Sequence, residues 1–505
     1  MHYITVAEEM KKIEQFVIEE VGVPSLVLME RASLSVSQRI KERALCKEKI
    51  CVVCGCGNNG ADGVAVARHL LEDKYKVDVV VLGNKEKYSQ ELKLQLNVFE
   101  KLGGKIFSEI SDREYDYYVD AIFGIGLTRE ITDREILKAI ETINLSDAYI
   151  YSVDIPSGIH TDTGFIMGSA VKANETITFT CDKVGLCVYP GKEYAGKVIL
   201  QNIGIFEEFI RTQSPKHYGI GIGDLKTVLK DYPDGNKGTY GKVLVIAGNQ
   251  EITGAALLCA KAAMKCGAGM VKVLSNEKTL DVIRTALPEA MVASLDHEDA
   301  DYETVKKAIL WADSVVCGPG IGTDKDAYTK LKVVLEEFPE NKKLILDADA
   351  LNILSMHSDL KQLASKVKEV VYTPHMKELS LLMNEHISKL KKDLDDCMKV
   401  VSEDAGIYVC KDSVTRVYAK DKPVYINRAG NCGMATAGCG DVLAGMIASM
   451  VARKDMNVYD GVVCAVYLHS YGADLAATQI GKNGLVAGDI IEYVTSILRT
   501  TEDGS

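Results

Sequence analysis

Residues 49–63, KICVVCGCGNNGADG, join a short apolar run to a glycine-rich turn. The run KICVVC predicts a buried strand over 49–54, and apolar residues at three- and four-residue spacing predict a helix over 61–72. In this arrangement the amides of the turn lie at the start of the helix, where unpaired N–H groups and the helix dipole attract an anion. The stretch therefore predicts a strand, an anion-binding turn and a helix in succession.

The same alternation of β-branched runs and helical patterns extends along the chain and is typical of parallel α/β sheets. In the first half it predicts strands at 49–54, 77–82, 117–123, 148–154, 175–180 and 197–203. In the second half it predicts strands at 242–247, 270–274, 314–317, 343–347, 370–373, 407–410, 414–419 and 423–427, before a long helical tail. The polar stretch at 206–240 is the best candidate for a linker. We therefore expect two α/β domains in tandem.

The composition of the 505 residues argues against several classes of protein. The net charge of −12 disfavours nucleic-acid binding, which needs a basic surface. No apolar run is long enough for a membrane span, and MHYITVAEEM lacks the regions of a signal peptide. The 14 cysteines are scattered singly, and Cys51 and Cys54 point to opposite faces of their predicted strand. We therefore expect a cytoplasmic protein with reduced thiols and no nucleic-acid or membrane partner.

Gly55 to Gly60 match the GxGxxG pattern of a dinucleotide-binding dehydrogenase. That class places an acidic residue near the end of the next strand, where it binds a ribose, but this strand ends Val81-Leu82-Gly83-Asn84. Asp78 stands at the start of the strand and is poorly placed for the role. The pattern alone therefore does not favour a dehydrogenase.

Two further polar clusters follow predicted strands in the first half. Residues 120–130 read DAIFGIGLTRE, and residues 153–158 read VDIPSG, followed by Asp162-Thr-Gly164. Gly, Asn, Asp, Pro and Ser are also ordinary turn residues, so one such cluster alone would indicate only a turn. Three at consecutive strand ends favour a ligand site in the crevice where open α/β sheets bind ligands.

The second half has its own glycine-rich turn, NCGMATAGCGDVLAG at 431–445. A helical pattern runs from Val442 onward, so Ala437 to Gly440 are expected to form a flexible turn that binds a phosphate. Asp441 would lie at the helix entrance, placed to take a proton from an attacking hydroxyl group. The alternative is a glycine-rich cap with an acidic residue in the first turn. No GxxxxGK[ST] motif is present to indicate a Walker-type site.

Other clusters follow the strands predicted in the second half. They read GNQEITGA at 248–255, GPGIG at 318–322, LDADALN at 346–352 and TPHMKE at 373–378, with Lys411 after IYVC. A lone histidine is usually packed or solvated. Because His375 follows a proline at a strand end in this series, we expect it to contact a ligand.

The first half resembles the N-terminal NAD(P)HX epimerase domain, also called the YjeF N-terminal domain, over roughly residues 1–210. The resemblance rests on GxGNNGGDG, DAxxGxGxxR, VDIPSGxxxxTG, Lys183-x-Gly185 and Pro190-Gly191. It implies a Rossmann-like domain in which Asp154 is the acid/base. It implies that the hydrated cofactor binds to Asn58, Asn59, Gly60, Ala61, Asp62, Gly124, Ile125, Gly126, Leu127, Thr128, Arg129, Glu130 and Asp154. It also implies a potassium ion bound by Asn59, Asp120 and Ser157.

Ala61 departs from this pattern, because the family usually has glycine there. A methyl group at this position is expected to narrow the approach of the backbone to the ligand.

The second half is similar to the ADP- or ATP-dependent NAD(P)HX dehydratase domain, which has the ribokinase-like fold, over about 220–500. The likeness rests on GPGxG, DADALN, TPHxxE and GNxGMAxxGxGDVLxG. It implies that Gly320, His375 and Asp441 contact the hydrated cofactor, with Asp441 as the base. It implies that the nucleotide contacts Ala255, Lys411, Asp412, Ser413, Val414, Thr415 and Gly440. The segment from Lys411 to Thr415 departs from the usual KGxxT, and Mg²⁺ is expected on the phosphates.

Together the two resemblances imply a bifunctional enzyme of two three-layer domains, residues 1–213 and 214–505. The first would interconvert R- and S-NAD(P)HX, and the second would dehydrate the S form of NADHX or NADPHX with ADP or ATP. We also expect a homo-oligomer. One alternative is a ribokinase-like kinase that phosphorylates a vitamin alcohol and is fused to a nucleotide-binding module. Another, for the first half only, is a non-catalytic binding or assembly module.

Overall fold

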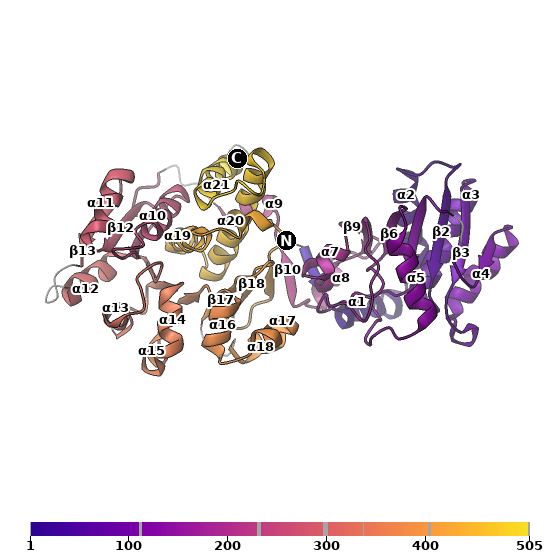
Figure 1. Cartoon of the computed structure of the whole chain (residues 1–505), viewed down its shortest axis with the longest axis horizontal. Coiled ribbons are helices and arrows are strands. Elements are labelled where there is room, and N and C mark those ends of the chain that lie inside the picture. The colour runs from indigo at the N-terminus through magenta and orange to yellow at the C-terminus, as the bar shows by residue number, and fades with distance from the viewer. Residues whose placement is uncertain are drawn as a thin grey trace. The chain divides into compact units, whose positions relative to one another are not determined.

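The computed structural model describes residues 2–110, 114–229, 234–295, 301–336, 338–401 and 406–502. The chain forms two compact units, residues 2–218 and residues 219–505, and each is described by itself (Figure 1). Within the described residues no helix is both long and apolar enough to cross a membrane. The predicted domain boundary after residue 213 stays a prediction.

The first unit is built around a seven-stranded parallel sheet in the order β4-β3-β2-β5-β6-β7-β9. Its strands are β1 (His2–Thr5), β2 (Lys49–Cys54), β3 (Lys76–Val81), β4 (Lys105–Phe107), β5 (Tyr117–Ala121), β6 (Tyr149–Val153), β7 (Glu175–Phe179), β8 (Asp182–Lys183) and β9 (Lys197–Gln201). Its helices are α1 (Ala7–Glu19), α2 (Ser25–Lys41), α3 (Asn58–Glu72), η1 (Lys85–Lys87), α4 (Gln90–Lys101), α5 (Arg134–Leu145), α6 (Val184–Cys187), α7 (Gly191–Tyr194) and α8 (Glu207–Thr212). Strand β1 pairs with β8.

Successive side chains of β2 point to opposite faces of the sheet and are apolar on both, which explains why helices cover both faces. Val52 and Cys54 pack into a core with α2, α3 and α4, whereas Cys51 and Val53 pack into a second core with α5. Side chains of a strand alternate between faces, so KICVVC buries apolar groups in two directions. The first unit therefore has the predicted three layers, with Cys51 and Cys54 on opposite faces.

The second unit contains nine strands in the order β13-β12-β11-β14-β15-β16-β17-β18-β19. They are β11 (Lys242–Ile246), β12 (Met270–Ser275), β13 (Met291–Ser294), β14 (Ser314–Cys317), β15 (Lys343–Leu346), β16 (Val370–Tyr372), β17 (Ile407–Cys410), β18 (Arg416–Tyr418) and β19 (Val424–Ile426). The strands from β13 to β17 are parallel, and β18 and β19 are antiparallel additions.

Helices cover both faces of this sheet. They are α9 (Ile222–Val228), α10 (Gly254–Lys265), α11 (Glu277–Ala286), α12 (Asp301–Trp311), α13 (Lys325–Glu336), α14 (Asp349–Met356), α15 (Ser358–Ala364), α16 (Met376–Met383), α17 (Ile387–Lys392), α18 (Leu394–Val401), η2 (Cys432–Met434), α19 (Cys439–Ala452), α20 (Val458–Ile480) and α21 (Ala487–Glu502). Helix α19 packs against α10, α20 and the central strands β11, β14 and β15. On the other face of the sheet, the helices from α12 to α18 share one apolar core with the strands.

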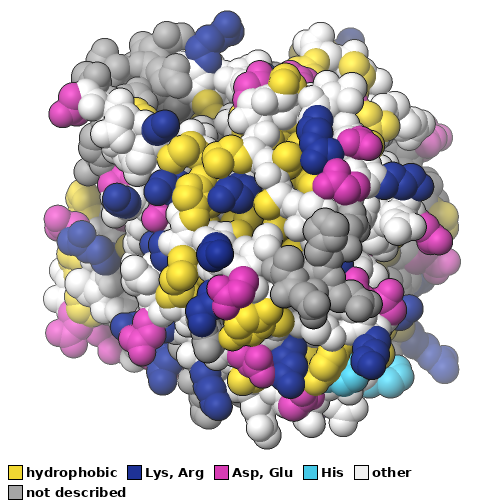
Figure 2. All heavy atoms as spheres, turned by 90° about the vertical axis from the view of Figure 1, so that its left-hand side faces the viewer, with side chains coloured by type: hydrophobic (Ala, Val, Ile, Leu, Met, Phe, Trp, Pro, Cys, Tyr) yellow, Lys and Arg dark blue, Asp and Glu magenta, His cyan; other side chains and the backbone are white. Residues whose placement is uncertain are grey.

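The surface of the molecule carries mixed charge on the face drawn in Figure 2. Over the described part of this face, Lys and Arg side chains are interspersed with Asp and Glu side chains, and hydrophobic side chains gather in small groups. The described residues of this face form no continuous basic surface of the kind that a phosphate backbone requires.

Each predicted strand is present, with ends that differ by at most two residues. Three predictions need correction. The presumed linker 206–240 contains α8, strand β10 (His217–Gly219) and α9, while its residues 230–233 lie outside the described part. Helix α3 begins at Asn58 rather than at residue 61, and α19 begins at Cys439 rather than at Val442. Both glycine-rich turns therefore contribute a first helical turn.

Candidate active sites

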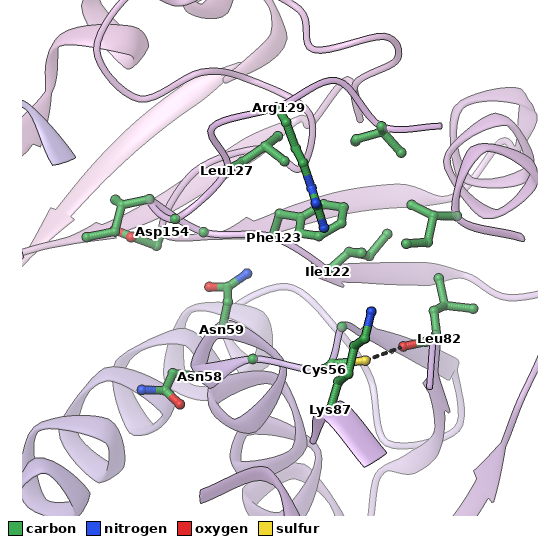
Figure 3. Close-up of a pocket in the computed structure, with 18 of the residues that line it drawn as sticks. Cys56, Asn58, Asn59, Leu82, Lys87, Ile122, Phe123, Leu127, Arg129 and Asp154 are labelled. Carbon is green, nitrogen blue, oxygen red and sulfur yellow. Dashed lines mark hydrogen bonds between the residues drawn. The ribbon is translucent and has the colours of Figure 1, made fainter. Parts of the chain in front are cut away.

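A cavity of about 990 Å³ lies at the carboxyl ends of β2, β3, β5 and β6 (Figure 3). Its walls come from the turn after β2, the segment after β3 and the segment from Ile122 to Asp133 after β5. Asp154, which follows β6, completes the lining with Lys11 and Glu14 of α1. In a parallel sheet these strand ends form the usual ligand crevice, and the volume suits a dinucleotide.

Most of the residues predicted for this site line the cavity. They are Asn58, Asn59, Asp62, Gly124, Ile125, Gly126, Leu127, Arg129, Glu130 and Asp154. Gly60, Ala61 and Thr128 are not among its lining residues.

The expectation that the methyl group of Ala61 narrows the site is wrong. Ala61 is fully buried and packs into the core between α3 and the sheet. Because α3 begins at Asn58, residue 61 already lies on the helix face that turns toward the sheet.

Asp154 is held by a buried lysine. Lys183 Nζ donates to Asp154 Oδ1 at 2.5 Å and to Thr178 Oγ1 at 2.8 Å, and Thr178 Oγ1 lies 3.1 Å from the same carboxylate oxygen. The Lys183 side chain is 1% exposed, whereas that of Asp154 is 14% exposed and reaches the cavity. Asp154 also has a φ of 67°, a left-handed conformation that costs a non-glycine residue about 1–3 kcal/mol. The fold thus fixes this carboxylate at the end of β6.

Glu14 and Asp62 are the acids of the cavity lining whose pKa values are raised by the charge of Asp154. Burial first, and then the charge of Asp154, raise the pKa of Glu14 to about 7. Burial, with the charges of Asp154 and Glu14, also raises the pKa of Asp62 well above its usual value. Glu14 was missed in the sequence because α1 carries several glutamates, and no local pattern distinguishes the one that faces the cavity. These groups give one end of the cavity an acidic lining.

The predicted cation ligands Asp120 and Ser157 are brought together below the cavity. Asp120 is fully buried and accepts hydrogen bonds from the Ser157 amide at 2.8 Å, the Ser157 hydroxyl at 2.5 Å and the Ser152 hydroxyl at 2.8 Å. Burial raises the pKa of Asp120, and the bonds from Ser157 oppose that shift. Asn59 lies against Gly124, which belongs to the segment after β5, and the Asn59 Nδ2 is buried with no partner among the described residues.

The second site is centred on a buried ion pair between Asp347 and Lys411. Lys411 Nζ donates to Asp347 Oδ1 at 2.7 Å, and the Thr373 hydroxyl donates to the same oxygen at 2.6 Å. The Asp347 side chain is 1% exposed. Gly440 lies against this pair, since a Cβ added there would stand 3.4 Å from Lys411 Nζ and 3.7 Å from Asp347 Oδ2. The glycine-rich turn and Lys411 of the second half therefore meet.

Asp441 lies in the first turn of α19, beside this pair. Burial first, and then the charge of Asp347, raise the pKa of Asp441 to about 6, although the charge of Lys411 opposes the rise. Burial alone would lower the pKa of Lys411, but Asp347, Glu378 and Asp441 outweigh it, and the pKa is raised. Asp441 is therefore a carboxylate that can accept a proton near neutral pH, next to a lysine that stays charged.

His375 and Glu378 form a second part of this site. His375 begins α16, its Nδ1 accepts from the Glu378 amide at 3.1 Å, and the Glu378 carboxylate accepts from the His375 amide at 2.8 Å. Half of the His375 side chain is exposed, and its backbone is bridged to Lys411. This reciprocal cap fixes the ring next to the Lys411–Asp347 pair while leaving it accessible.

The remaining predicted residues lie on three other segments. A Cβ at Gly320 would stand 3.1 Å from the Ala255 side chain, so the start of α10 and the turn after β14 are in contact. Asp412 and Ser413 are exposed in the turn between β17 and β18, Val414 is buried, and the Thr415 carbonyl accepts from Asn427 at 2.9 Å.

Asp347 and His469 were not among the predicted site residues. Asp347 had a signal, because it opens the quoted DADALN segment. His469 had none, since it lies inside α20; burial lowers its pKa to about 4, and its Nε2 has no partner in the described chain.

Known families match both halves of the chain. The family described as NAD(P)H-hydrate dehydratase matches residues 243–496, and the family described as YjeF-related protein N-terminus matches residues 25–185. A bifunctional NAD(P)H-hydrate repair enzyme of Moorella thermoacetica is 32% identical, over 99% of this chain and 97% of the relative. The chain belongs to the bifunctional NAD(P)H-hydrate repair enzymes.

Other repair enzymes align over nearly the whole chain. The Escherichia coli enzyme is 30% identical over 98% of this chain and 94% of its own length. A solved ribokinase-like superfamily protein of Enterococcus faecalis has a TM-score of 0.51 and 27% identity, and covers 57% of this chain and 96% of its own. These matches confirm the prediction of a bifunctional repair enzyme with an epimerase-type first half and a ribokinase-like dehydratase second half.

Proposed function

We propose that the first half interconverts the two epimers of hydrated NADH or NADPH at C6 of the nicotinamide ring. Interconversion requires either loss and return of the hydroxyl group or opening of the ring, and each route needs a group that moves a proton at that hydroxyl. Asp154 is assigned this role because it reaches the cavity while Lys183 fixes its position. The Asn58–Asp62 turn and the Gly124–Glu130 segment are assigned to the phosphates and the ring, with Gly60 and Ala61 acting through the backbone.

The oxygen atoms around Asp120 fit the potassium ion that the first half is proposed to bind. Asp120, Ser157 and Asn59 offer carboxylate, hydroxyl and amide groups, which are hard donors suited to such an ion. The Asn59 amide has a buried Nδ2 without a described partner, and exchanging its N and O atoms would turn an oxygen into that space. A bound potassium ion would supply fixed positive charge beneath the substrate.

We propose that the second half dehydrates the S epimer by transient phosphorylation. Asp441 takes the proton of the C6 hydroxyl, and that oxygen attacks the terminal phosphorus of ADP or ATP, releasing AMP or ADP. The C6–O bond then breaks as the ring nitrogen donates its electron pair, inorganic phosphate leaves, and loss of a C5 proton restores the dihydronicotinamide. The chain chiefly positions the groups and balances charge.

The other assigned residues of the second half hold the two substrates. Lys411 offsets phosphate charge, and Gly440 leaves room for a phosphate beside it. Gly320 and His375 are assigned to binding of the hydrated cofactor. The nucleotide is assigned to Ala255 and the segment from Asp412 to Thr415.

Mg²⁺ would be held by phosphate oxygens and by Asp347. Both hydrogen bonds to Asp347 are made to Oδ1, which leaves Oδ2 facing Gly440. Carboxylate oxygens suit this ion, which would offset charge on the transferring group when bound.

The single observation that carries the proposal is the meeting of Asp441, Lys411 and Gly440 in one site. The test incubates NADHX with each nucleotide and measures NADH, inorganic phosphate and phosphate esters together. Dehydration predicts one inorganic phosphate for each NADH formed. A ribokinase-like vitamin kinase would instead yield a stable ester and no NADH, and that outcome would refute the proposal.

A further inference from the structure

Two cations stand in the first cavity away from its acidic end. Lys87 and Arg129 both line the cavity, and in Figure 3 the Lys87 ammonium and the Arg129 guanidinium point toward the space between its walls. Within the described residues neither side chain takes part in an ion pair. The acidic groups that line this part of the cavity are Glu130 and Asp133, and Asp133 already accepts from two amides as the cap of α5. Two cations without described carboxylate partners are typical of a phosphate site.

Lys87 is fixed in place by the glycine-rich turn. It ends the short helix η1, whose cap is Asn84. Cys56 Sγ lies 3.2 Å from the Leu82 carbonyl, as Figure 3 shows, and the Cys56 carbonyl accepts from the Ser89 amide at 2.9 Å. The segment that carries Lys87 is therefore tied at both ends to the turn that follows β2.

The order of the strands separates Lys87 from Asp154. Lys87 follows β3 and Asp154 follows β6, and the order β3-β2-β5-β6 places two strands between them. At a spacing of about 4.8 Å between neighbours this separation is about 14 Å, which a dinucleotide spans. In dinucleotide-binding folds with this strand order, the dinucleotide lies across the carboxyl ends of the strands where the strand order reverses. The adenosine ribose then lies beyond the end of the strand that occupies the position of β3.

The residues near this ribose position are not those of an enzyme that selects a free 2′-hydroxyl. An acidic residue at the end of β3 would accept from that hydroxyl and would repel a phosphate. Here the cavity is lined by Leu82, Asn84 and Lys87 instead. Asp78, the acid of this strand, accepts from the Tyr115 hydroxyl at 3.0 Å and does not line the cavity.

We propose that Lys87 binds the 2′-phosphate of hydrated NADPH, so that the first half favours NADPHX over NADHX. This inference rests on the proposed epimerase function of that half. Arg129 follows β5, near the middle of the sheet, where the pyrophosphate common to both substrates would lie. It therefore serves either substrate, and Lys87 alone distinguishes them.

The test measures kcat/KM of epimerisation for each substrate with the full-length protein and no ADP or ATP, so that only the first half can act. The wild type is expected to favour NADPHX. Lys87→Gln is expected to lower kcat/KM for NADPHX by about 10- to 100-fold, the effect of losing a hydrogen bond between charged groups. The value for NADHX should change less than about 3-fold. Lys87→Arg should keep the preference, and Lys85→Gln, on the same short helix but outside the cavity lining, is the matched control.

Two results would overturn the inference. If Lys87→Gln lowers kcat/KM equally for both substrates, Lys87 contacts the pyrophosphate that both share. If it lowers kcat/KM for neither substrate, Lys87 does not contact the substrate. Dehydration by the same variant, measured with ADP and ATP, reports whether the chain is folded. If the wild type epimerises neither compound, the proposed function itself fails; if it epimerises both and Lys87→Gln changes neither, only the assignment of Lys87 fails.

Discussion

Replacing Asp441 with asparagine is expected to stop dehydration and, at neutral pH, to stabilise the protein. Asparagine keeps the size of the side chain but cannot take a proton from the C6 hydroxyl. Loss of a general base lowers the rate of the chemical step by about 10²- to 10⁴-fold. The same substitution removes a negative charge from a buried position, so activity and stability should change in opposite directions.

The size of the stabilisation follows from the environment of Asp441. Burial first, and then the charge of Asp347, raise its pKa from 3.8 to about 6. A pKa rise of this size corresponds to a loss of about 3 kcal/mol in the free energy of unfolding once Asp441 is ionised. Because the side chain is partly exposed, we expect Asp441→Asn to raise the free energy of unfolding by about 1–3 kcal/mol. A raised carboxyl pKa destabilises the folded state as pH rises from about 4 to about 6. Asp441→Asn should therefore unfold at the same denaturant concentration as the wild type at pH 4, and at a higher one at pH 7.5.

The assay combines three measurements on the wild type and Asp441→Asn. Recovery of dihydronicotinamide absorbance reports dehydration, chromatographic separation of the epimers reports the first half, and denaturant unfolding reports stability. Wild-type dehydration by the variant would refute the assignment of Asp441 as the base. Unchanged or lower stability at pH 7.5 would show that Asp441 is not in the buried, acid-lined position on which the argument depends.

Three further predictions concern other residues and conditions. Asp154→Asn should lower epimerisation by at least about 10²-fold and leave dehydration of pure S epimer unchanged; loss of both activities would contradict two independent sites. The rate of dehydration at saturating substrates should fall about tenfold per pH unit below pH 6, where Asp441 becomes protonated, and a rate independent of pH between 4.5 and 7 would count against this base. Ala61→Gly should lower the free energy of unfolding by about 1 kcal/mol, since glycine weakens a helix, and leave kcat/KM of epimerisation unchanged. A several-fold rise in that value would restore the idea that the Ala61 methyl group narrows the site.

Strands were the most predictable part of the fold. In KICVVC the five residues after Lys49 are all apolar and buried, and a strand buried on both faces leaves this continuous signal. Among the described residues the missed strands are β1, β4, β8, β10 and β13, and each has four residues or fewer. Strands β4 and β13 also stand at the edges of their sheets. Such short strands bury too little apolar surface to leave a pattern.

Helix starts were predicted about three residues too late, and this shaped the errors in the sites. Apolar periodicity reports only the buried face of a helix, and the first turns of α3 and α19 consist of Asn, Gly, Cys and Asp residues. The late start for α3 led to the wrong direction for the Ala61 methyl group. The sequence therefore located both glycine-rich turns but not the side-chain directions within them.

Long-range partners within the sites could not be predicted from local patterns. Lys183 was noted as part of a motif, but its bond to Asp154 depends on how β6, β7 and β8 are brought together. Lys411 and Asp347 meet only because β15, β16 and β17 are neighbours in the sheet. Spacing along the chain carries no information about such pairs.

The central claim is that one chain both epimerises and dehydrates the damaged cofactor. Its most direct test is recovery of dihydronicotinamide absorbance from an equal mixture of R- and S-NADPHX, with ADP or ATP supplied. Recovery should be complete with at least one nucleotide and absent when both are omitted. Rapid recovery that stops at half of the mixture would show that the first half does not epimerise, and no recovery with either nucleotide would contradict the account as a whole.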